Sequence, residues 1–236
     1  MLKFKQIYET LSSMHGPQGW WPLLELHNHK TNKGTNPTKT GSMQGYHPNN
    51  YTYPQTERQK FEICLGAILT QNTAWPNVEK ALTNLNAIKA IDQKIINEIT
   101  IELLKELIRP AGYFNQKSIY LKEFTKFFLK LKGNAPSRER LLEVKGIGNE
   151  TADSILLYAY RQPEFVVDAY TRRIFTNLKI IKEEATYMEI KGLFESNLKK
   201  DFKIFQEYHA LIVEHAKKYY LKKEDYNRCP LLKQKV

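Results

Sequence analysis

The sequence predicts an all-α protein, and three observations support that fold class. Apolar residues recur every three or four positions over most of the chain, as in residues 3–14 and 203–222. No stretch gives a convincing strand pattern. In residues 141–173, the two-glycine turn Gly146-Ile147-Gly148 directly precedes a further helical pattern that begins with Ala152 and Ile155. A glycine turn followed at once by a helix is typical of helical proteins that hold an anion at a helix N-terminus.

The same periodicity predicts the elements in order. Helices are expected at 3–14, from Glu57 to about 69, around 78–85, around 103–108, up to about 131, from Pro136, after Gly148, after Asp168, at 186–198 and at 203–222. Residues 27–55 contain no acidic residue and almost no aliphatic residue. Such a composition cannot bury enough surface to pack, so a long surface loop is expected there. It is either a basic loop that touches DNA or a flexible insertion.

Composition limits the partners. The chain has 236 residues, enough for one large or two small domains, and carries 36 Lys and Arg against 25 Asp and Glu, a net charge of +11. This balance favours a polyanionic partner, nucleic acid before membrane. No apolar run reaches the roughly 18 residues of a membrane span. With only Cys64 and Cys229, no disulfide framework is possible, which predicts a reducing compartment such as the cytoplasm.

Two features of residues 141–173 could carry chemistry. The glycine turn lets backbone N–H groups approach another molecule, although a lone turn of this kind also joins ordinary core helices. Twenty residues after Gly148, the apolar run Phe165-Val166-Val167 leads to Asp168 at the start of another predicted helix. By itself Asp168 is a good N-cap residue, because aspartate accepts hydrogen bonds from the first turn of a helix.

Taken together, these motifs resemble the helix-hairpin-helix DNA glycosylases of the endonuclease III superfamily. The resemblance rests on the hairpin, on Thr151-Ala152, on Val166-Val167-Asp168 with Arg173, and on the stretches 68–73 and 112–117. It implies that Asp168 is catalytic and that the hairpin grips a DNA phosphate. The expected DNA-binding residues, including a glutamine that fills the gap left by a flipped base, are Gln71, Lys117, Lys145, Gly146, Ile147, Gly148 and Thr151.

The resemblance also implies two helical lobes with the active site in the cleft between them. Residues 57–162 would form the helical bundle that ends in the hairpin. Residues 1–56 and 163–236 would form the second lobe, including the polar loop at 27–55. Double-stranded damaged DNA is the expected partner of a monomeric protein.

The chain departs from the family at two places. Bifunctional members carry a lysine two residues after the second hairpin glycine, where it attacks the sugar and permits strand cleavage; this chain has Glu150 there. Many relatives bind a [4Fe–4S] cluster with four cysteines near the C-terminus, where this chain offers only Cys229. The resemblance therefore predicts a monofunctional glycosylase without strand-cleaving lyase activity, and no metal or cofactor.

Substrate chemistry narrows the prediction to alkylated purines such as 3-methyladenine. An N-alkylated purine is cationic and leaves without being protonated, and electron-rich aromatic faces attract a flat cation. Monofunctional 3-methyladenine glycosylases of this superfamily are the closest resemblance, which predicts a substrate pocket made of Trp20, Trp21, Pro22, Trp75 and Lys217. Two alternatives stay open: a glycosylase for an adenine mispair or an oxidised pyrimidine, and a non-catalytic helix-hairpin-helix DNA-binding protein.

Overall fold

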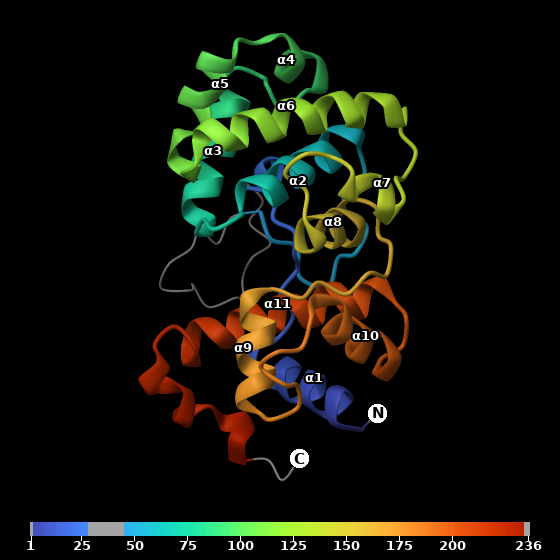
Figure 1. The fold of residues 1–236 in the computed structure, drawn as a ribbon, viewed down its shortest axis with the longest axis vertical. Coiled ribbons are helices and arrows are strands. Elements are labelled where there is room, and N and C mark those ends of the chain that lie inside the picture. Colours follow the sequence, from blue (N-terminus) through green and yellow to red (C-terminus); the bar gives the residue numbers. More distant parts are fainter. Residues whose placement is uncertain (1, 28–44, 234–236) are drawn as a thin grey trace.

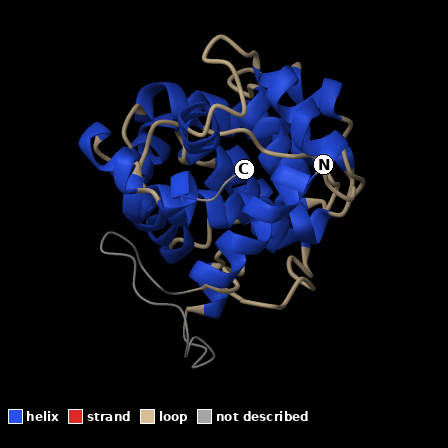
Figure 2. Cartoon of the chain, turned by 90° about the horizontal axis from the view of Figure 1, so that it is seen from below, coloured by secondary structure: helices blue, strands red, loops and turns tan. Residues whose placement is uncertain are grey.

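The computed structural model describes residues 2–27 and 45–233, and all regular secondary structure in these ranges is helical (Figure 2). The predicted all-α fold class is therefore confirmed. The α-helices are α1 (Leu2–His15), α2 (Glu57–Leu69), α3 (Trp75–Ala87), α4 (Gln93–Glu98), α5 (Ile101–Ile108), α6 (Phe114–Leu131), α7 (Arg138–Leu142), α8 (Asn149–Ser154), α9 (Ala169–Asn177), α10 (Tyr187–Asn197) and α11 (Phe202–Tyr219).

Short polar residues set where many of these helices begin. Thr56 and Gln59 form a reciprocal capping box at the start of α2, and Thr186 and Glu189 form another at α10. Asp92 caps α4, a helix that the sequence did not predict because six residues are too few to show a period. The C-terminal 3₁₀ turns Lys223–Arg228 and Pro230–Lys233 were not predicted either.

The helices form two groups, as expected (Figure 1). Helices α2 to α8 make the upper group in that view, where α2 packs on α3 and α6, and α4 and α5 pack on α6. Helix α1 lies in the lower group, against α10 and α11, and α9 also packs on α11. The N-terminal helix thus joins the C-terminal helices. The exact domain boundaries, at residues 57–162, stay a prediction.

A π-helical turn, Ile155–Ala159, continues α8 and connects the two groups. All five of its residues are buried, and it packs against α2 in one group and α11 in the other. Buried aromatic side chains contact one another in both groups. In the lower group Phe165 stacks on Phe194 with ring centres 4.0 Å apart, and in the upper group Phe61 lies 5.0 Å from Phe128. The buried apolar residues of both groups form one continuous core, which runs through the π-helical turn.

The segment that precedes α2 corrects the expectation of a surface loop at 27–55. Residues 28–44 lie outside the described residues, but residues 45–55 pack onto the protein. The His47 ring contacts the Trp21 carbonyl oxygen at 3.0 Å, and Tyr51 donates a hydrogen bond to Glu207 at 3.3 Å. Arg161 donates to three consecutive carbonyl oxygens of residues 52–54. Hydrogen bonds of polar residues hold this segment in place. The spacing of apolar residues in the sequence gives no sign of such bonds.

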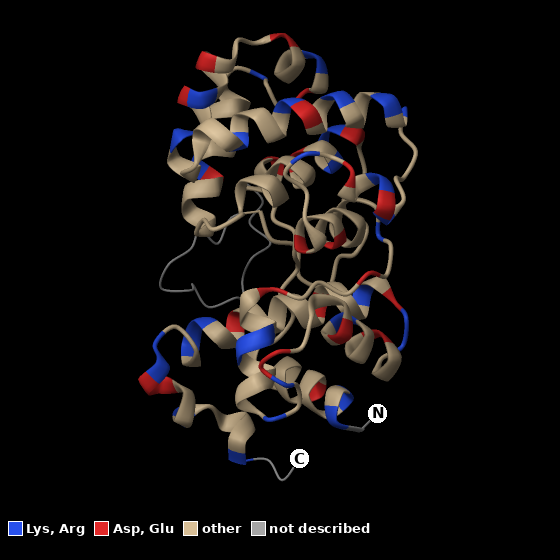
Figure 3. Ribbon diagram, viewed as in Figure 1, with Lys and Arg blue, Asp and Glu red and all other residues tan. Residues whose placement is uncertain are grey.

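Positive charge is not confined to one group of helices. Lysine and arginine residues lie in both the upper and the lower group (Figure 3). A long polyanion that spans both groups would meet positive charge along its path. None of the helices in the described part of the chain is both long enough and apolar enough to cross a membrane.

Candidate active site and DNA interface

The hairpin turn uses its two glycines for different purposes. Gly146 has a φ of +88°, and a Cβ atom built there would lie 2.2 Å from Cγ of the Tyr120 ring. Gly148 has a φ of −96°, and a Cβ atom there would meet nothing within 4 Å. Gly146 is therefore required by the fold, because only glycine fits its conformation and its space. Gly148 is exposed and leaves open the approach to the start of α8.

The first turn of α8 has no side-chain cap. Gly148 is its N-cap residue. Lys145, Gly148 and Asn149 are exposed, whereas Ile147 is buried and anchors the turn from below. Unpaired N–H groups at a helix N-terminus, beside a lysine, form an arrangement that binds a phosphate.

Gln71 and Thr151 hold the hairpin from the side. The Gln71 amide nitrogen donates to the Gly146 carbonyl oxygen at 2.9 Å and to the Thr151 hydroxyl at 3.0 Å. Thr151 is buried, so its side chain faces the protein and only its backbone lies toward the exposed turn. Gln71 thus lies beside the hairpin, with its amide nitrogen bound to it. Its role in filling the gap left by a flipped base stays a prediction.

Lys117 is not a phosphate contact, and that prediction was wrong. The residue is 2% exposed, and its ammonium group donates to the carbonyl oxygens of Leu69 and Ala111 and to the Thr73 hydroxyl, at 2.7–2.9 Å. Burial lowers its pKa to about 8. The side chain ties the turn after α2 to the turn before α6, which is a structural role.

Asp168 caps helix α9 with one oxygen and leaves the other beside a histidine. Oδ1 accepts hydrogen bonds from the Thr171 backbone N–H at 2.7 Å and from its hydroxyl at 2.8 Å, and Oδ2 lies 3.8 Å from Nε2 of His209. Burial alone would raise the pKa of this carboxyl group. The interaction with His209 and the bonds from Thr171 more than offset burial and lower the pKa below its ordinary value. These contacts favour the ionised form of the carboxyl group.

A cluster of aromatic rings extends from His209, the neighbour of this carboxylate. The Trp20 ring lies 5.7 Å from the His209 ring and 6.4 Å from the Tyr158 ring. The Trp21 ring lies 5.2 Å from Tyr158 and 5.4 Å from Trp75, in edge-to-face arrangements. The structure therefore brings all three tryptophans into one cluster. Trp21 is 6% exposed and forms its interior, whereas Trp20 and Trp75 are half-buried at its border.

Lys217 approaches the same cluster from α11. Its ammonium group lies 6.0 Å from the centre of the Trp20 ring and 3.7 Å from the Glu214 carboxylate. Burial lowers the pKa of Lys217, and Glu214 partly opposes that shift. Pro22 is buried next to Trp21 in the chain. Lys217 thus lies beside Trp20. Direct contact of Lys217 or of Pro22 with a base stays a prediction.

Glu150 occupies the position of the family's lysine, and its carboxyl group interacts electrostatically with Asp168. It is an exposed residue in the first turn of α8. The protein around its carboxyl group and then the negative charge of Asp168 raise its pKa to about 7, against a smaller opposing effect of His209. Two carboxyl groups with opposite pKa shifts therefore lie near one another, one ionised and one that exchanges a proton near neutral pH.

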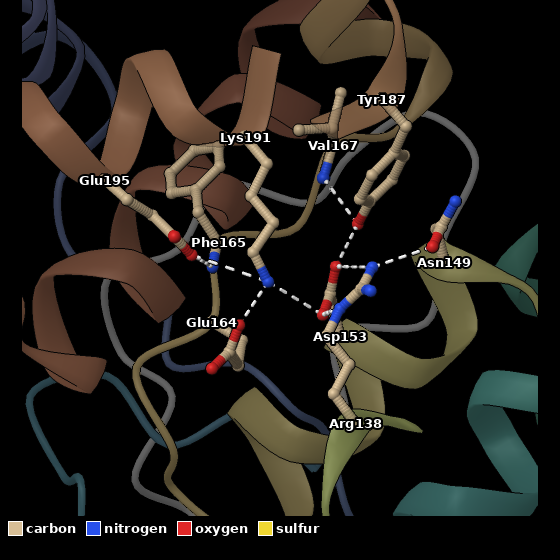
Figure 4. A network of polar contacts seen from close by, with 9 residues as sticks. All are labelled: Arg138, Asn149, Asp153, Glu164, Phe165, Val167, Tyr187, Lys191 and Glu195. Carbon is tan, nitrogen blue, oxygen red and sulfur yellow. Dashed lines mark hydrogen bonds and ion pairs between the residues drawn. The ribbon is translucent and has the colours of Figure 1, made fainter. Parts of the chain in front are cut away.

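A buried ionic network joins the hairpin to the segment that leads to Asp168 (Figure 4). Its centre is Asp153 of α8, which is fully buried and accepts from Arg138 of α7 at 2.8 Å and from Lys191 of α10 at 2.9 Å. Tyr187 of α10 donates to the other Asp153 oxygen at 2.7 Å. Arg138 also donates to Asn149, in the first turn of α8, at 2.7 Å.

The same network reaches the chain just before Asp168. The Val167 backbone N–H donates to the Tyr187 hydroxyl at 3.4 Å, and the Phe165 backbone N–H donates to Glu195 at 2.9 Å. Lys191 contacts Glu164 and Glu195 as well as Asp153. The hairpin and Asp168 are therefore held by one set of charged groups. Breaking a buried, paired set of this kind is strongly destabilising.

Two residues near Asp168 were missed by sequence reasoning. Tyr158 and His209 contact one another and both lie against Trp20. A signal for His209 was present, because it precedes Lys217 by eight positions and so lies on a similar face of the same helix. Tyr158 gave no such signal, since it lies in the π-helical turn, whose spacing differs from that of an α-helix. Among the described residues, no three His, Cys, Asp or Glu side chains form a group that could hold a metal ion.

Two solved structures resemble this fold. The structure of 3-methyladenine DNA glycosylase (MagIII) from H. pylori, bound to 1,N6-ethenoadenine, aligns with a TM-score of 0.66 and 29% identity, and the alignment covers 91% of this chain and 97% of that one. A non-covalent endonuclease III–DNA complex aligns with a TM-score of 0.72 and 18% identity, covering 98% of this chain and 93% of that one. The second likeness concerns the fold alone.

Sequence comparison gives the family. The "Putative DNA repair glycosylase MJ1434" of Methanocaldococcus jannaschii is 41% identical over 237 residues, which cover 96% of this chain and 92% of that protein. Residues 65–200, which contain the hairpin and Asp168, match the HhH-GPD superfamily of base excision DNA repair proteins. The chain therefore belongs to the HhH-GPD superfamily of base excision DNA repair proteins.

Proposed function

We propose that this protein is a monofunctional DNA glycosylase that removes alkylated purines such as 3-methyladenine from double-stranded DNA. The observation that carries the proposal is the position of Asp168. Its ionised carboxylate lies against His209, which packs on Trp20, and the Lys217 ammonium group lies over the Trp20 ring. A carboxylate beside an aromatic surface suits a cationic base whose sugar gains positive charge as the base leaves.

The chemistry follows from these positions. The start of α8 would bind a phosphate of the DNA backbone, and the damaged nucleotide would rotate out of the duplex to stack on the tryptophan cluster. The bond between C1′ and the base nitrogen then breaks, and the cationic purine leaves as a neutral base. The Asp168 carboxylate stabilises the positive sugar, and water adds to C1′ and releases a proton to solvent.

Glu150 supports hydrolysis rather than lyase chemistry. A carboxyl group cannot form an imine with C1′, so no covalent Schiff base is expected at this position. Borohydride should trap no adduct between the protein and DNA, and strand cleavage should require alkali or a separate nuclease. An efficiently trapped adduct would point to another lysine, with Lys217 the first to examine because it lies beside Trp20.

The substrate is tested with a panel of defined duplexes. Purified protein is incubated with methylated DNA and with duplexes that carry uracil, an adenine mispair or an oxidised pyrimidine, and the released bases are measured. We expect release of 3-methyladenine and little release of uracil or of undamaged purines. Faster release of another base would show that the substrate belongs to a different class. Binding without release of any base would favour a non-catalytic DNA-binding protein.

The tryptophans allow the pocket itself to be tested. Trp20 is half-buried and Trp21 is 6% exposed, so the two adjacent residues form a matched pair. Trp20→Ala should reduce base release with a small change in melting temperature. Trp21→Ala should lower the melting temperature, because truncating a buried aromatic residue costs about 3–5 kcal/mol. If Trp20→Ala retains full activity, Trp20 does not stack on the base.

A further inference from the structure

His209 of α11 lies between Tyr158 and Asp168. Its Nδ1 atom is 2.7 Å from the Tyr158 hydroxyl oxygen, and its Nε2 atom is 3.8 Å from Oδ2 of Asp168. The residue is 5% exposed, and within the described part of the chain Nε2 is buried without a hydrogen-bond partner. A buried nitrogen without a partner costs free energy, so its position beside a carboxylate needs a physical reason.

The contacts of His209 allow two positions for its ring proton. The Tyr158 hydroxyl has one proton, which it donates either to Nδ1 or to the Gln206 carbonyl oxygen, 3.3 Å away. In the first case Nδ1 is an acceptor and the ring carries its proton on Nε2. In the second case Nδ1 carries the ring proton and donates it to Tyr158, which leaves the lone pair of Nε2 facing the Asp168 carboxylate. That repulsion favours the first arrangement, in which an N–H group lies on the side of Asp168.

The position of Tyr158 is fixed by the backbone. It lies in the π-helical turn Ile155–Ala159, and the carbonyl oxygen of the preceding residue, Leu157, accepts a hydrogen bond from the Gln206 side chain at 2.8 Å. Gln206 lies one turn before His209 on α11. The π-helical turn and α11 are therefore locked together where Tyr158 meets His209. Single π-helical turns often occur at functional sites.

We propose that Tyr158 and His209 form a positioning pair for Asp168. Tyr158 orients the His209 ring, and the Nε2–H group of His209 holds Oδ2 of Asp168 while Thr171 holds Oδ1. The pair keeps the carboxylate ionised and correctly turned toward the sugar of a bound nucleotide. This inference rests on the proposed function, since it assigns to Asp168 a role in base release.

Four titratable groups, one from each of four elements, face Asp168. Glu150 comes from α8, Tyr158 from the π-helical turn, His209 from α11 and Tyr170 from the helix α9 that Asp168 caps. Tyr158 and Tyr170 have pKa values raised above the ordinary value by burial and remain neutral. Glu150 is the one whose raised pKa, about 7, overlaps the range of the assay. The pH experiments are therefore done both in the native protein and in a Glu150→Gln background.

The first experiment measures base release from methylated DNA as a function of pH. Removing the N–H group by His209→Leu should raise the pKa of Asp168, so the acid limb moves to higher pH by about one unit, a ten-fold loss of release on that limb. His209→Gln should move it less, because the glutamine amide can still donate to Oδ2. Tyr158→Phe should produce an intermediate shift, since the histidine ring loses its orientation.

His215→Leu is the matched control. His215 lies on the same helix, six positions later, is fully buried and contacts Cys229 at 3.1 Å and His15 at 3.0 Å rather than Asp168. The same change at this position should leave the acid limb in place. If His209→Leu and His215→Leu have the same pH profile as the native protein, or if both shift it equally, the positioning pair is refuted.

The second experiment needs no activity. The ¹⁵N shifts and proton couplings of the His209 ring give the protonation state of each nitrogen, and we expect a proton on Nε2. A bare Nε2 atom would overturn the proposal. This readout separates the two proposals: native protein that releases no base at any pH disproves the proposed function, whereas active protein with a bare Nε2 atom disproves only the positioning pair.

Discussion

Helices α8 and α9 begin at the two candidate functional segments of the molecule, and their first turns differ in how they are capped. The first turn of α8 follows exposed Gly148 and has no side-chain cap. The first turn of α9 is capped by Asp168, whose Oδ1 accepts from the Thr171 N–H group at 2.7 Å. One helix N-terminus is open to an external anion, and the other holds an anion that belongs to the protein.

The same physical effect allows an anion to be held at each of these two helix N-termini. Unpaired N–H groups give a helix N-terminus a partial positive charge, which stabilises a nearby negative group. At α8 the chain provides no such group in the cap position, so a phosphate of the DNA could take that place. At α9 the charge helps to keep Asp168 ionised. The network centred on Asp153 joins the two turns, so a phosphate held at α8 would be held at a fixed distance from Asp168.

The largest effect is expected from removing the charge at α9. In Asp168→Asn the amide oxygen can still accept from Thr171, so the melting temperature and DNA affinity should change little. Base release should fall by about 10²-fold or more, because the charge that stabilises the sugar is lost. Single-turnover release and thermal unfolding are measured on the same preparation. Near-native release from this variant would show that Asp168 is only a helix cap.

The second effect concerns the open turn of α8. In Gly148→Val the new Cβ atom meets no protein atom within 4 Å, and the side chain covers the approach to the first N–H groups. DNA affinity should therefore fall by about ten-fold, or 1.4 kcal/mol, at unchanged melting temperature. Affinity is measured over a salt series, since phosphate contacts release counterions.

Gly146→Val is the contrasting variant for that test. Its side chain would collide with Tyr120 and strain a φ of +88°, so it should lower the melting temperature as well as the affinity. Equal melting temperatures for the two valine variants, or native affinity in Gly148→Val, would contradict the distinction between a structural and an open glycine.

The smallest effect is the pH dependence of stability that arises from Glu150. Its pKa is raised to about 7 in the folded protein, so the folded state binds more protons than the unfolded state between pH 4.5 and 7. Its contribution to stability is therefore present at low pH and lost as the pH rises through 7. Glu150→Gln should show a smaller difference in melting temperature between pH 5 and pH 8 than the native protein.

Glu62 must be measured in parallel, because burial also raises its pKa to about 7 and its effect has the same sign. Glu62 lies in α2, 1% exposed, and accepts from the Leu24 backbone N–H. The Glu150→Gln change should reduce the pH dependence in a Glu62→Gln background by the same amount as in the native protein. An unchanged pH dependence in both backgrounds would place Glu150 in bulk water, away from Asp168.

Much of the fold was predictable because it depends on local pattern. Helices with an apolar stripe, such as α1 and α11, were found close to their observed bounds, since burial of one face imposes the helical period on the sequence. Asp168 was predicted at the start of a helix, and it caps α9. Helix α4 was missed because its six residues contain only two apolar positions of the stripe, Ile95 and Ile96.

The sequence by itself determined the helices, the hairpin, the position of Asp168 at a helix start and the absence of a lysine at position 150. Only the tertiary structure decided which side chains are free to act. The positive charge of Lys117 suggested a DNA contact, but oxygen atoms from two turns surround its ammonium group and bury it. Trp20 and Trp21 are adjacent and chemically identical, yet packing buries one and leaves the other at the border of the cluster. His209 reaches Asp168 across 41 residues of chain, because α9 and α11 pack together. Local patterns report which residues face a core, whereas these outcomes depend on contacts between distant segments that only the folded chain creates.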